Sequence, residues 1–396
     1  MNFEFNYGMD DFTLACPKCE FNRLEVICED GSEKTILAAK PKKEDKLLYA
    51  FNIDGGLCQT NQFGTSMSDA LLTKIISVDT NSEKAVLHIF EENGYLFPLS
   101  NTAINEVDLP SVIELIKRIK AAVFLMAALD SNETDYDRIL HLTMYLLLGH
   151  EIKLAKNTDR RTVYTSLTNS AIRSLSVPST YIDANYESDD EFEYYSVSDR
   201  IYPKTFKLSV EEYTDIVQNE TFNYNYPGIG DELYRKLTSA YKNDQDRGKN
   251  QRLIVEFLFH YMHSAGVIKS VSFDDGIEYY GAADYSKFDE NLKKALISVA
   301  RLTLAEEINY NVRGIKPLYN PRNLEPTWKA TDLLSALYFS VYYMKPGTEI
   351  YRKCANPSCG GYFLVKTTNS LKKYCCDNCR NANNQRDHRK REKRKK

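Results

Sequence analysis

Five of the nine cysteines of this chain lie in one short stretch, CANPSCGGYFLVKTTNSLKKYCCDNC. Cys354 and Cys359 form a Cys-x4-Cys pair, and the second pair consists of Cys379 with either Cys375 or Cys376. Two closely spaced pairs supply the four thiolates that a structural zinc ion binds at tetrahedral corners. The spacing therefore predicts one zinc ion, held by Cys354, Cys359, Cys375 and Cys379, with Cys376 as the alternative to Cys375.

The residues around and between the two pairs predict how the ligands are held. Tyr374 precedes Cys375, and an aromatic residue directly before the ligand favours Cys375 over the cysteine that follows it. Between the pairs we expect a short hairpin, with a strand over 362–365 and a turn over 367–370. Phe363 is expected to supply most of the apolar core of this small module. Metal binding would add the folding energy that so small a core lacks.

A basic tail, RNANNQRDHRKREKRKK, follows the last cysteine and contains neither proline nor glycine, so we expect a helix. Lysine and arginine bind phosphates, and asparagine and glutamine can read base edges. The aromatic residues near the cysteines are few and are expected in the core, which disfavours stacking on single strands. A bound acidic protein surface and a solvated tail without a partner remain as alternatives. The residues that we expect to contact nucleic acid are Arg380, Asn384, Arg386, Arg389, Lys390, Lys393 and Arg394.

The net charge of −4 hides an uneven distribution of charge along the chain. Residues 352–396 contain fourteen lysines and arginines and three acidic residues, a net charge of +11. The other 351 residues therefore carry a net charge of −15. This asymmetry predicts an acidic body joined to a basic interaction module.

The C-terminal part of the chain, from LLSALYFSVYY to NNQRDHRKR, resembles the zinc finger of the CGNR family. The shared features are a helix that leads into Cys-x4-Cys, an aromatic residue before the third cysteine, and a last cysteine followed by an Arg/Asn-rich helix. The resemblance implies a bacterial DNA-binding regulator with a variable, stress-related N-terminal domain, and it is the reason to prefer DNA over RNA.

Two departures from the family pattern stand at the second cysteine pair. The sequence Cys-Gly-Asn-Arg of the family is Cys-Arg-Asn-Ala here, over 379–382, and Trp-Cys-Ser is Tyr-Cys-Cys, over 374–376. We find no such resemblance for residues 1–320.

The rest of the chain indicates an α+β fold: a predominantly helical body, a small mixed N-terminal region and a C-terminal zinc module of treble-clef or ribbon-like type. We expect a mixed α/β region over 1–105, a helical domain over 106–345 with an acidic loop at 183–199, and the zinc module with its basic helix over 351–396. In the first region the pattern predicts a hairpin over 22–40 and strands over 46–53 and 84–90. Helices are expected around 112–123 and over 135–150, 159–175, 209–219, 230–242, 249–264, 287–310 and 327–344.

Other candidate sites are weaker. Cys16 and Cys19 form a half-site that Cys28 and Cys58 would have to complete. The alternatives are a second zinc ion bound by these four cysteines and ordinary thiols without a metal. His260 follows Glu256 by four residues and precedes His263 by three, which allows a shared metal but is also typical of a helix core. The loop over 52–66 lacks the lysine of a phosphate-binding loop.

No spacing is typical of a catalytic set of side chains, so a binding protein is favoured over an enzyme. The N-terminal sequence MNFEFNYGMDDF has no basic and apolar regions of a signal peptide, and no apolar run has membrane-spanning length, so we expect a cytoplasmic protein without a membrane partner. Three functions follow: a nucleic-acid-binding regulator, an effector enzyme that the tail delivers to nucleic acid, or an adaptor for an acidic protein. A homodimer and a small-molecule effector of the body are left open.

Overall fold

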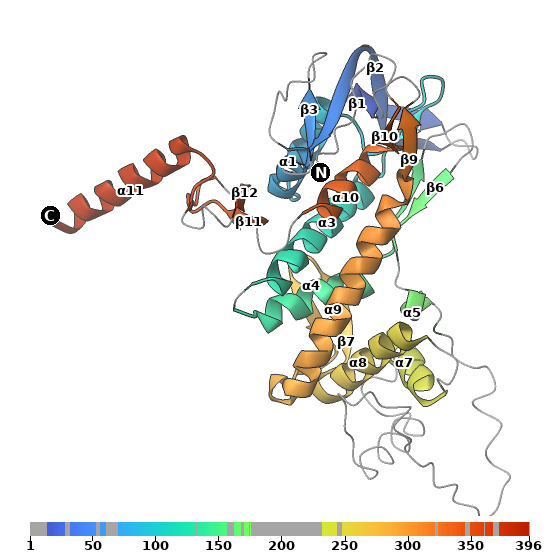
Figure 1. Ribbon diagram of the computed structural model, residues 1–396, viewed down its shortest axis with the longest axis vertical. Helices are drawn as coiled ribbons and strands as arrows, with labels where there is room; N and C mark the ends of the chain where they lie inside the picture. The colour runs from blue at the N-terminus through green and yellow to red at the C-terminus, as the bar shows by residue number, and fades with distance from the viewer. Residues whose placement is uncertain are drawn as a thin grey trace, which may run out of the picture. The chain divides into compact units, whose positions relative to one another are not determined.

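In the computed structural model the chain forms two compact units. Figure 1 shows the helices and strands of the chain, coloured from the N-terminus to the C-terminus. Unit 1 consists of Met1–Asn132, Glu151–Ser166 and Glu307–Lys396, and unit 2 of Glu133–His150 and Leu167–Glu306. The fold is a mixture of helices and strands, with a cysteine cluster near the C-terminus. The structure describes residues 14–27, 32–52, 56–60, 70–131, 133–156, 162–167, 170–173, 175, 232–243, 248–320, 324–344, 349–359, 361–366 and 372–395.

A four-stranded antiparallel sheet forms the N-terminal part of unit 1. The long strand β2 (Glu33–Asn52) pairs with β1 (Ala15–Ile27), with β3 (Gly56–Thr60) and with the short β4 (Asn105–Glu106). The register of β1 and β2 confirms the predicted hairpin, and the predicted strand over 46–53 is the end of β2.

The predicted strand over 84–90 is wrong, because this segment lies in helix α2 (Glu83–Asn93). The side chain of Ser82 caps the helix by accepting a hydrogen bond of 3.3 Å from the Ala85 N–H. Val86 and Phe90, four residues apart, are buried on one face. A short apolar run cannot by itself distinguish a strand from a buried helix, and here the serine cap decides for the helix.

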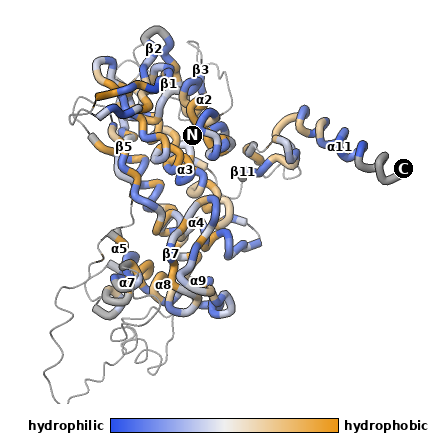
Figure 2. Tube along the Cα trace, turned by 180° about the vertical axis from the view of Figure 1, so that it is seen from behind, coloured by the Kyte–Doolittle hydropathy of each residue, from blue (hydrophilic) through white to orange (hydrophobic). Residues whose placement is uncertain are grey.

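Three helices form the apolar centre of unit 1: α1 (Leu71–Ser77), α3 (Leu109–Leu129) and α10 (Leu333–Tyr342). The helix expected around 112–123 is confirmed as α3, whose apolar character Figure 2 shows. Its side chains from Val112 to Leu125 are largely buried, on every side of the helix. A helix that is apolar nearly all round needs neighbours on several sides, which explains its central place in the unit.

A buried ion pair lies among these apolar side chains. Arg118 on α3 and Glu307 on α9 (Glu290–Asn311) have side chains that are both 2% exposed. The Arg118 guanidinium donates two hydrogen bonds, of 2.5 and 3.2 Å, to the Glu307 carboxylate. The hydroxyl of Tyr338 donates to the same carboxylate at 2.8 Å, and the Asn311 side chain donates to the Glu307 carbonyl at 2.9 Å. The charged groups are therefore well satisfied, as burial in a region of low dielectric constant requires.

Two hairpins replace parts of the predicted helices in unit 1. The segment over 159–175 contains β6 (Thr162–Thr165), which pairs with β5 (Lys153–Lys156), and β-branched residues favour this strand. The helix expected over 327–344 begins only after Asp332, whose carboxylate accepts a hydrogen bond of 2.8 Å from the Ser335 N–H. Before that cap, β10 (Glu325–Ala330) pairs with β9 (Ile315–Asn320), which follows the short helix η2 (Val312–Gly314).

Unit 2 is built mainly from helices, and four of them confirm predictions: α4 (Tyr136–Leu148), α7 (Glu232–Asn243), α8 (Lys249–Ala265) and α9, whose last turns belong to unit 1. The unit also contains the short α5 (Ser170–Arg173), a hairpin of β7 (Ile268–Ser272) with β8 (Gly276–Tyr279), and η1 (Tyr285–Lys287). This hairpin was not predicted. The expected helix over 209–219 and the expected acidic loop over 183–199 lie outside the described residues.

None of the helices in the described part of the chain is both long enough and apolar enough to span a membrane. The division into three consecutive domains, over 1–105, 106–345 and 351–396, stays a prediction. The two compact units are instead discontinuous along the sequence, with α9 passing from one to the other.

Candidate metal centre and basic helix

The first cysteine pair lies on the loop between two paired strands, β11 (Glu349–Lys353) and β12 (Tyr362–Lys366). The Cys354 N–H donates to the Gly361 carbonyl at 2.9 Å, and the Cys359 N–H donates to the Asn356 carbonyl at 2.9 Å. These bonds help to close a tight loop that reverses the chain between β11 and β12.

The predicted strand over 362–365 is confirmed, but its predicted partner is wrong. β12 pairs with the strand before Cys354 and not with residues after the expected turn over 367–370, a turn that lies outside the described residues. The reason is that the loop between Cys354 and Cys359 is itself the hairpin turn, so the strands on either side of it are already in register.

The four predicted ligand sulfurs lie together. The Sγ atoms of Cys354, Cys359, Cys375 and Cys379 are all within 4.8 Å of one another, with 3.7 Å between Cys359 and Cys375 and 3.5 Å between Cys375 and Cys379. Metal–sulfur bonds of about 2.3 Å at tetrahedral corners place sulfurs about 3.8 Å apart. All four cysteines are free, so the cluster has the donor set and the spacing to bind one metal ion.

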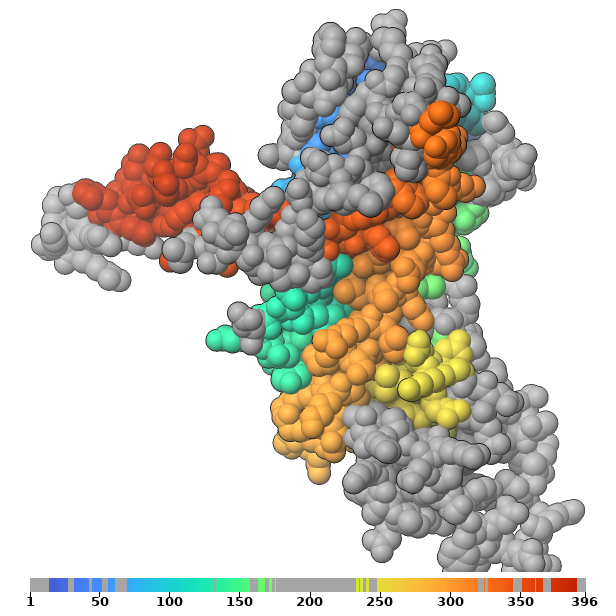
Figure 3. All heavy atoms as spheres, in the orientation of Figure 1, coloured from blue at the N-terminus to red at the C-terminus, as the bar shows by residue number. Residues whose placement is uncertain are grey.

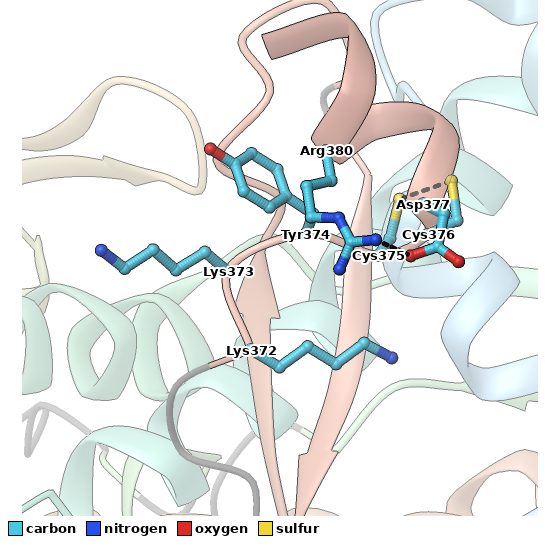
Figure 4. Close-up of a pocket in the computed structure, with 7 residues that line it drawn as sticks. All are labelled: Lys372, Lys373, Tyr374, Cys375, Cys376, Asp377 and Arg380. Carbon is cyan, nitrogen blue, oxygen red and sulfur yellow. Dashed lines mark hydrogen bonds and ion pairs between the residues drawn. The ribbon is translucent and has the colours of Figure 1, made fainter. Parts of the chain in front are cut away.

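Cys376 is not part of this group of four. Its exposed Sγ lies 3.8 Å from that of Cys375 and lines a hollow of about 620 Å³ at the start of the last helix (Figure 4). The walls of the hollow also include Lys372, Lys373 and Arg380, whose guanidinium lies 3.1 Å from Asp377. The geometry therefore favours Cys375 as the ligand, and Cys376 borders a basic surface instead.

The crowding of sulfurs affects their protonation. Burial raises the pKa of the Cys375 thiol, and its hydrogen bonds with the sulfurs of Cys379, Cys359 and Cys354 raise it further. Thiolates this close repel one another, and each added negative charge disfavours the next. A bound cation removes this repulsion, and coordination deprotonates the thiols.

A small apolar core supports the cluster. Cys354, Phe363 and Val365 are buried together, and Tyr374, Cys375 and Cys379 pack against them. The ammonium group of Lys372 lies 5.3 Å from the centre of the Phe363 ring. Phe363 therefore lies in the core of the module, as the sequence predicts.

The hairpin is also docked onto the helices of unit 1. The Ser77 hydroxyl, at the end of α1, donates to the Tyr362 carbonyl at 3.0 Å and accepts from the Tyr362 N–H at 2.9 Å. The Tyr362 ring packs on Phe124 of α3, with 4.9 Å between ring centres, and the hydroxyls of Thr73 and Tyr351 are 3.3 Å apart. No local sequence pattern predicts this docking, because α1 is far from the hairpin along the chain.

The last helix, α11 (Asp377–Lys395), confirms the predicted basic helix, and one row of its side chains is tied to the cluster. Cys379, Asn383 and Arg386 follow one another at helical spacing and are each half-buried. The Asn383 side chain donates to the Tyr374 hydroxyl at 3.0 Å. One guanidinium nitrogen of Arg386 donates to Asn356 Oδ1 and to Ser358 Oγ, both at 2.9 Å.

The predicted nucleic-acid contacts are thus not equivalent. Arg386 is engaged with the loop between the first two cysteines, so the sequence missed its positioning role. Arg380, Asn384 and Arg389 are exposed. The other three predicted contacts lie in the same helix: Lys390, Lys393 and Arg394.

The N-terminal cysteines are arranged differently. The thiols of Cys16 and Cys19 on β1 donate to carbonyls of α2, at 3.8 Å to Asn93 and 3.2 Å to Phe90. Burial raises the pKa of both thiols to about 12, and both thiols are engaged with helix carbonyls, as ordinary buried thiols are. Cys58 lies on β3, and Cys28 lies outside the described residues. Among the residues that the structure does describe, the C-terminal cysteines form the one group of potential metal ligands.

The histidine pair lies in the core of unit 2. His260 is buried in α8 beside Phe259 and Tyr241, with 5.1 Å between its ring centre and that of Tyr241. Burial, and to a smaller extent the charge of His263, lowers the pKa of His260 to about 3. The ring is therefore neutral at pH 7. Glu256 is buried on the same helix. Within the described part of the chain these residues form no metal-ligand group.

Comparison of the chain with protein-family models, with curated proteins and with solved structures finds no match. These comparisons therefore do not test the resemblance of the C-terminal segment to the CGNR zinc finger, which depends on the sequence motifs alone. The geometry of the cysteine cluster and of α11 is the structural evidence for a function.

Proposed function

We propose that this protein is a zinc-dependent nucleic-acid-binding protein, in which a four-cysteine zinc centre fixes the basic helix α11 so that it can dock on DNA. By its resemblance to the CGNR family it would act in the cytoplasm as a transcriptional or stress regulator. The observation that carries the proposal is the row formed by Cys379, Asn383 and Arg386, which joins the cationic helix to the sulfur cluster.

Zinc is the metal that the donor set favours. Four thiolates in a tetrahedral arrangement are typical of structural zinc sites, and all four positions are filled by the protein, which leaves no open position for catalysis. A hairpin that carries the first pair, followed by a helix that carries the last ligand, is the arrangement of a treble-clef or ribbon-like module. The cytoplasm keeps such thiols reduced and available.

The charge of α11 favours nucleic acid as its partner. Eight basic and three acidic residues lie between Asp377 and Lys395, while the chain before residue 352 is acidic. An acidic body would repel an acidic partner except at this helix, so the helix is the part of the chain to which phosphates would be attracted. A rigid attachment through the cluster would also reduce the entropy lost when the helix docks.

A salt titration of the full-length, metal-loaded protein against a labelled DNA duplex tests this function. The logarithm of the binding constant should fall linearly with the logarithm of salt concentration, by about 0.9 per neutralised phosphate. Arg380→Gln/Arg389→Gln should weaken binding and make the slope shallower. The matched control Lys34→Gln/Lys153→Gln, which removes two exposed charges from the body, should change neither.

Two results would contradict the proposal. One is a protein that binds no duplex at low salt. The other is binding that persists unchanged after the metal has been removed. Tight binding to an acidic polypeptide, without binding to DNA, would favour the adaptor function instead.

A further inference from the structure

The face of α11 that points away from the cysteine cluster has an unusual composition. Because Cys379, Asn383 and Arg386 face the cluster, the helical period of 3.6 residues places Asn381, Asn384, Gln385 and His388 on the opposite side. All four are exposed. We call these four residues the amide face.

Within the described residues, the amide face makes no contact that would explain its composition. In the part of the chain that the structure describes, no hydrogen bond or ion pair engages these four side chains, and Figure 3 shows the visible side of α11 uncovered by other described segments of unit 1. Asparagine is a poor helix former, by up to about 0.7 kcal/mol per residue relative to alanine. Asn383 is explained by its bond to Tyr374, whereas Asn381 and Asn384 have no such explanation.

Uncharged donor–acceptor groups on a basic helix are suited to base edges. Asparagine and glutamine can make two hydrogen bonds to adenine in the major groove, while phosphates are bound best by lysine and arginine. From Asn381 to His388 the helix rises about 10 Å at 1.5 Å per residue. The major groove, about 12 Å wide, admits an α-helix by its diameter, and a length of about 10 Å along the groove corresponds to about three base pairs.

Cations lie at both ends of this face. Before it, Lys372, Lys373 and Arg380 surround the hollow at the start of α11 (Figure 4), and after it comes the exposed Arg389. Among the described residues the Arg380 guanidinium is paired with Asp377 at the surface, and such pairs are weak enough to exchange for a phosphate. Phosphate contacts at both ends would fix the register of the amide face along the groove.

The other features of the module favour a B-form duplex over RNA or single strands. The rings of Tyr362, Phe363 and Tyr374 are used in packing or in a hydrogen bond, so none is available to stack on an unpaired base. The major groove of A-form RNA is too narrow to admit a helix.

We propose that the amide face reads base edges in the major groove of double-stranded DNA and gives the protein preference for a short, adenine-containing site. This inference rests on the proposed function and names its substrate class. Arg386 acts in it as a positioning residue, since it holds the helix on the loop between the first two cysteines.

Selection of sequences from a random duplex library, with the zinc-loaded full-length protein, tests the inference. The wild type should enrich a motif of about three base pairs that contains adenine. Asn381→Ala/Asn384→Ala/Gln385→Ala should retain its zinc and its binding to unselected duplex. It should lose about tenfold or more of the preference for the motif over a scrambled duplex, since each two-bond contact contributes about 1–3 kcal/mol. Alanine favours helices, so these changes should not unfold α11.

Control variants distinguish a loss of sequence preference from a loss of overall affinity for duplex DNA. Arg389→Gln should weaken binding to motif and scrambled duplex by the same factor, and Lys34→Gln/Lys153→Gln should change neither. A triple variant that is as selective as the wild type would overturn the inference. A wild type that binds all duplexes equally would also overturn the inference, but the proposed function would stand. A wild type that prefers single-stranded RNA would overturn the inference as well. A wild type that binds no duplex would overturn both.

Discussion

The centre of unit 1 and the C-terminal module are stabilised by different means. Around α3 the chain buries apolar side chains on all sides of a long helix and even accommodates an ion pair. In the described part of the module, one small cluster of Cys354, Phe363 and Val365 is buried, and Tyr351 is buried on the same hairpin. Each buried side chain contributes about 2 kcal/mol, and ordering the backbone costs roughly 1–2 kcal/mol per residue. We therefore expect the body to fold through its own core and the module to depend on a bound ion.

The largest effect should follow from removal of the metal. A structural zinc site contributes about 10–16 kcal/mol in small zinc-binding peptides, which exceeds what the core of the module supplies. We expect a chelator to abolish hydrogen-exchange protection of α11 and β12 while the amides of α3 stay protected. Cys376→Ser should behave as the wild type. Equal protection of α11 with and without metal would contradict the comparison.

The ion pair of the body should produce the next largest effect. Glu307→Gln leaves Arg118 buried without a compensating charge, and loss of one partner of a buried pair typically costs about 3–5 kcal/mol. Chemical denaturation should show this loss in the body, with the metal content unchanged. Glu106→Gln is the matched control, because it breaks an exposed pair with Lys34 that contributes about 1 kcal/mol or less. Similar losses for the two variants would show that burial of the pair is irrelevant.

A buried histidine should give the body a pH dependence of its own, which can be followed in unit 2. His260 has a folded-state pKa of about 3 and an unfolded value of 6.5, so the unfolded chain binds more protons between these two pH values. Stability should therefore be complete above pH 6.5 and fall as the pH is lowered, by at most about 1.4 kcal/mol per pH unit. Thermal unfolding should depend less on pH in His260→Gln than in the wild type. The control His88→Gln, which changes an exposed histidine, should have the pH dependence of the wild type. An unchanged pH profile in His260→Gln would contradict the assignment.

The smallest effect should come from Arg386, which joins α11 to the first cysteine pair. Its two hydrogen bonds are partly exposed, so we expect Arg386→Ala to weaken the module by about 1 kcal/mol, or about fivefold in metal affinity. Arg386→Lys should be nearly as damaging, because an ammonium group cannot reproduce the planar guanidinium contact. Competition with a chelator measures both, and Arg389→Ala is the control. A full rescue by lysine would mean that charge alone matters.

The metal-ligand set could be predicted from the sequence because it is local. Four cysteines within one short stretch leave few ways to build a tetrahedral site, and the structure brings together the predicted four. The choice between Cys375 and Cys376 was also indicated, by the preceding tyrosine. Helix α11 was predictable for a similar reason, since its composition favours a helix without help from the rest of the chain.

What the sequence could not show depends on distant contacts. The docking of Tyr362 on Ser77 joins residues 285 apart, and no local pattern signals it. The inward position of Arg386 follows from the loop that contains Asn356, so composition alone classed it with the other cations. The apolar run over 84–90 is ambiguous between strand and helix, and only the serine before it, which caps the helix, distinguishes the two.

Metal content of the purified full-length protein, measured by mass spectrometry, tests the central claim most directly. We predict one zinc ion per chain in the wild type and in Cys376→Ser, and none in Cys354→Ser/Cys379→Ser, with the body still folded in all three. Wild-type protein that is free of metal yet has an ordered α11, or a double variant that keeps its zinc, would contradict the claim.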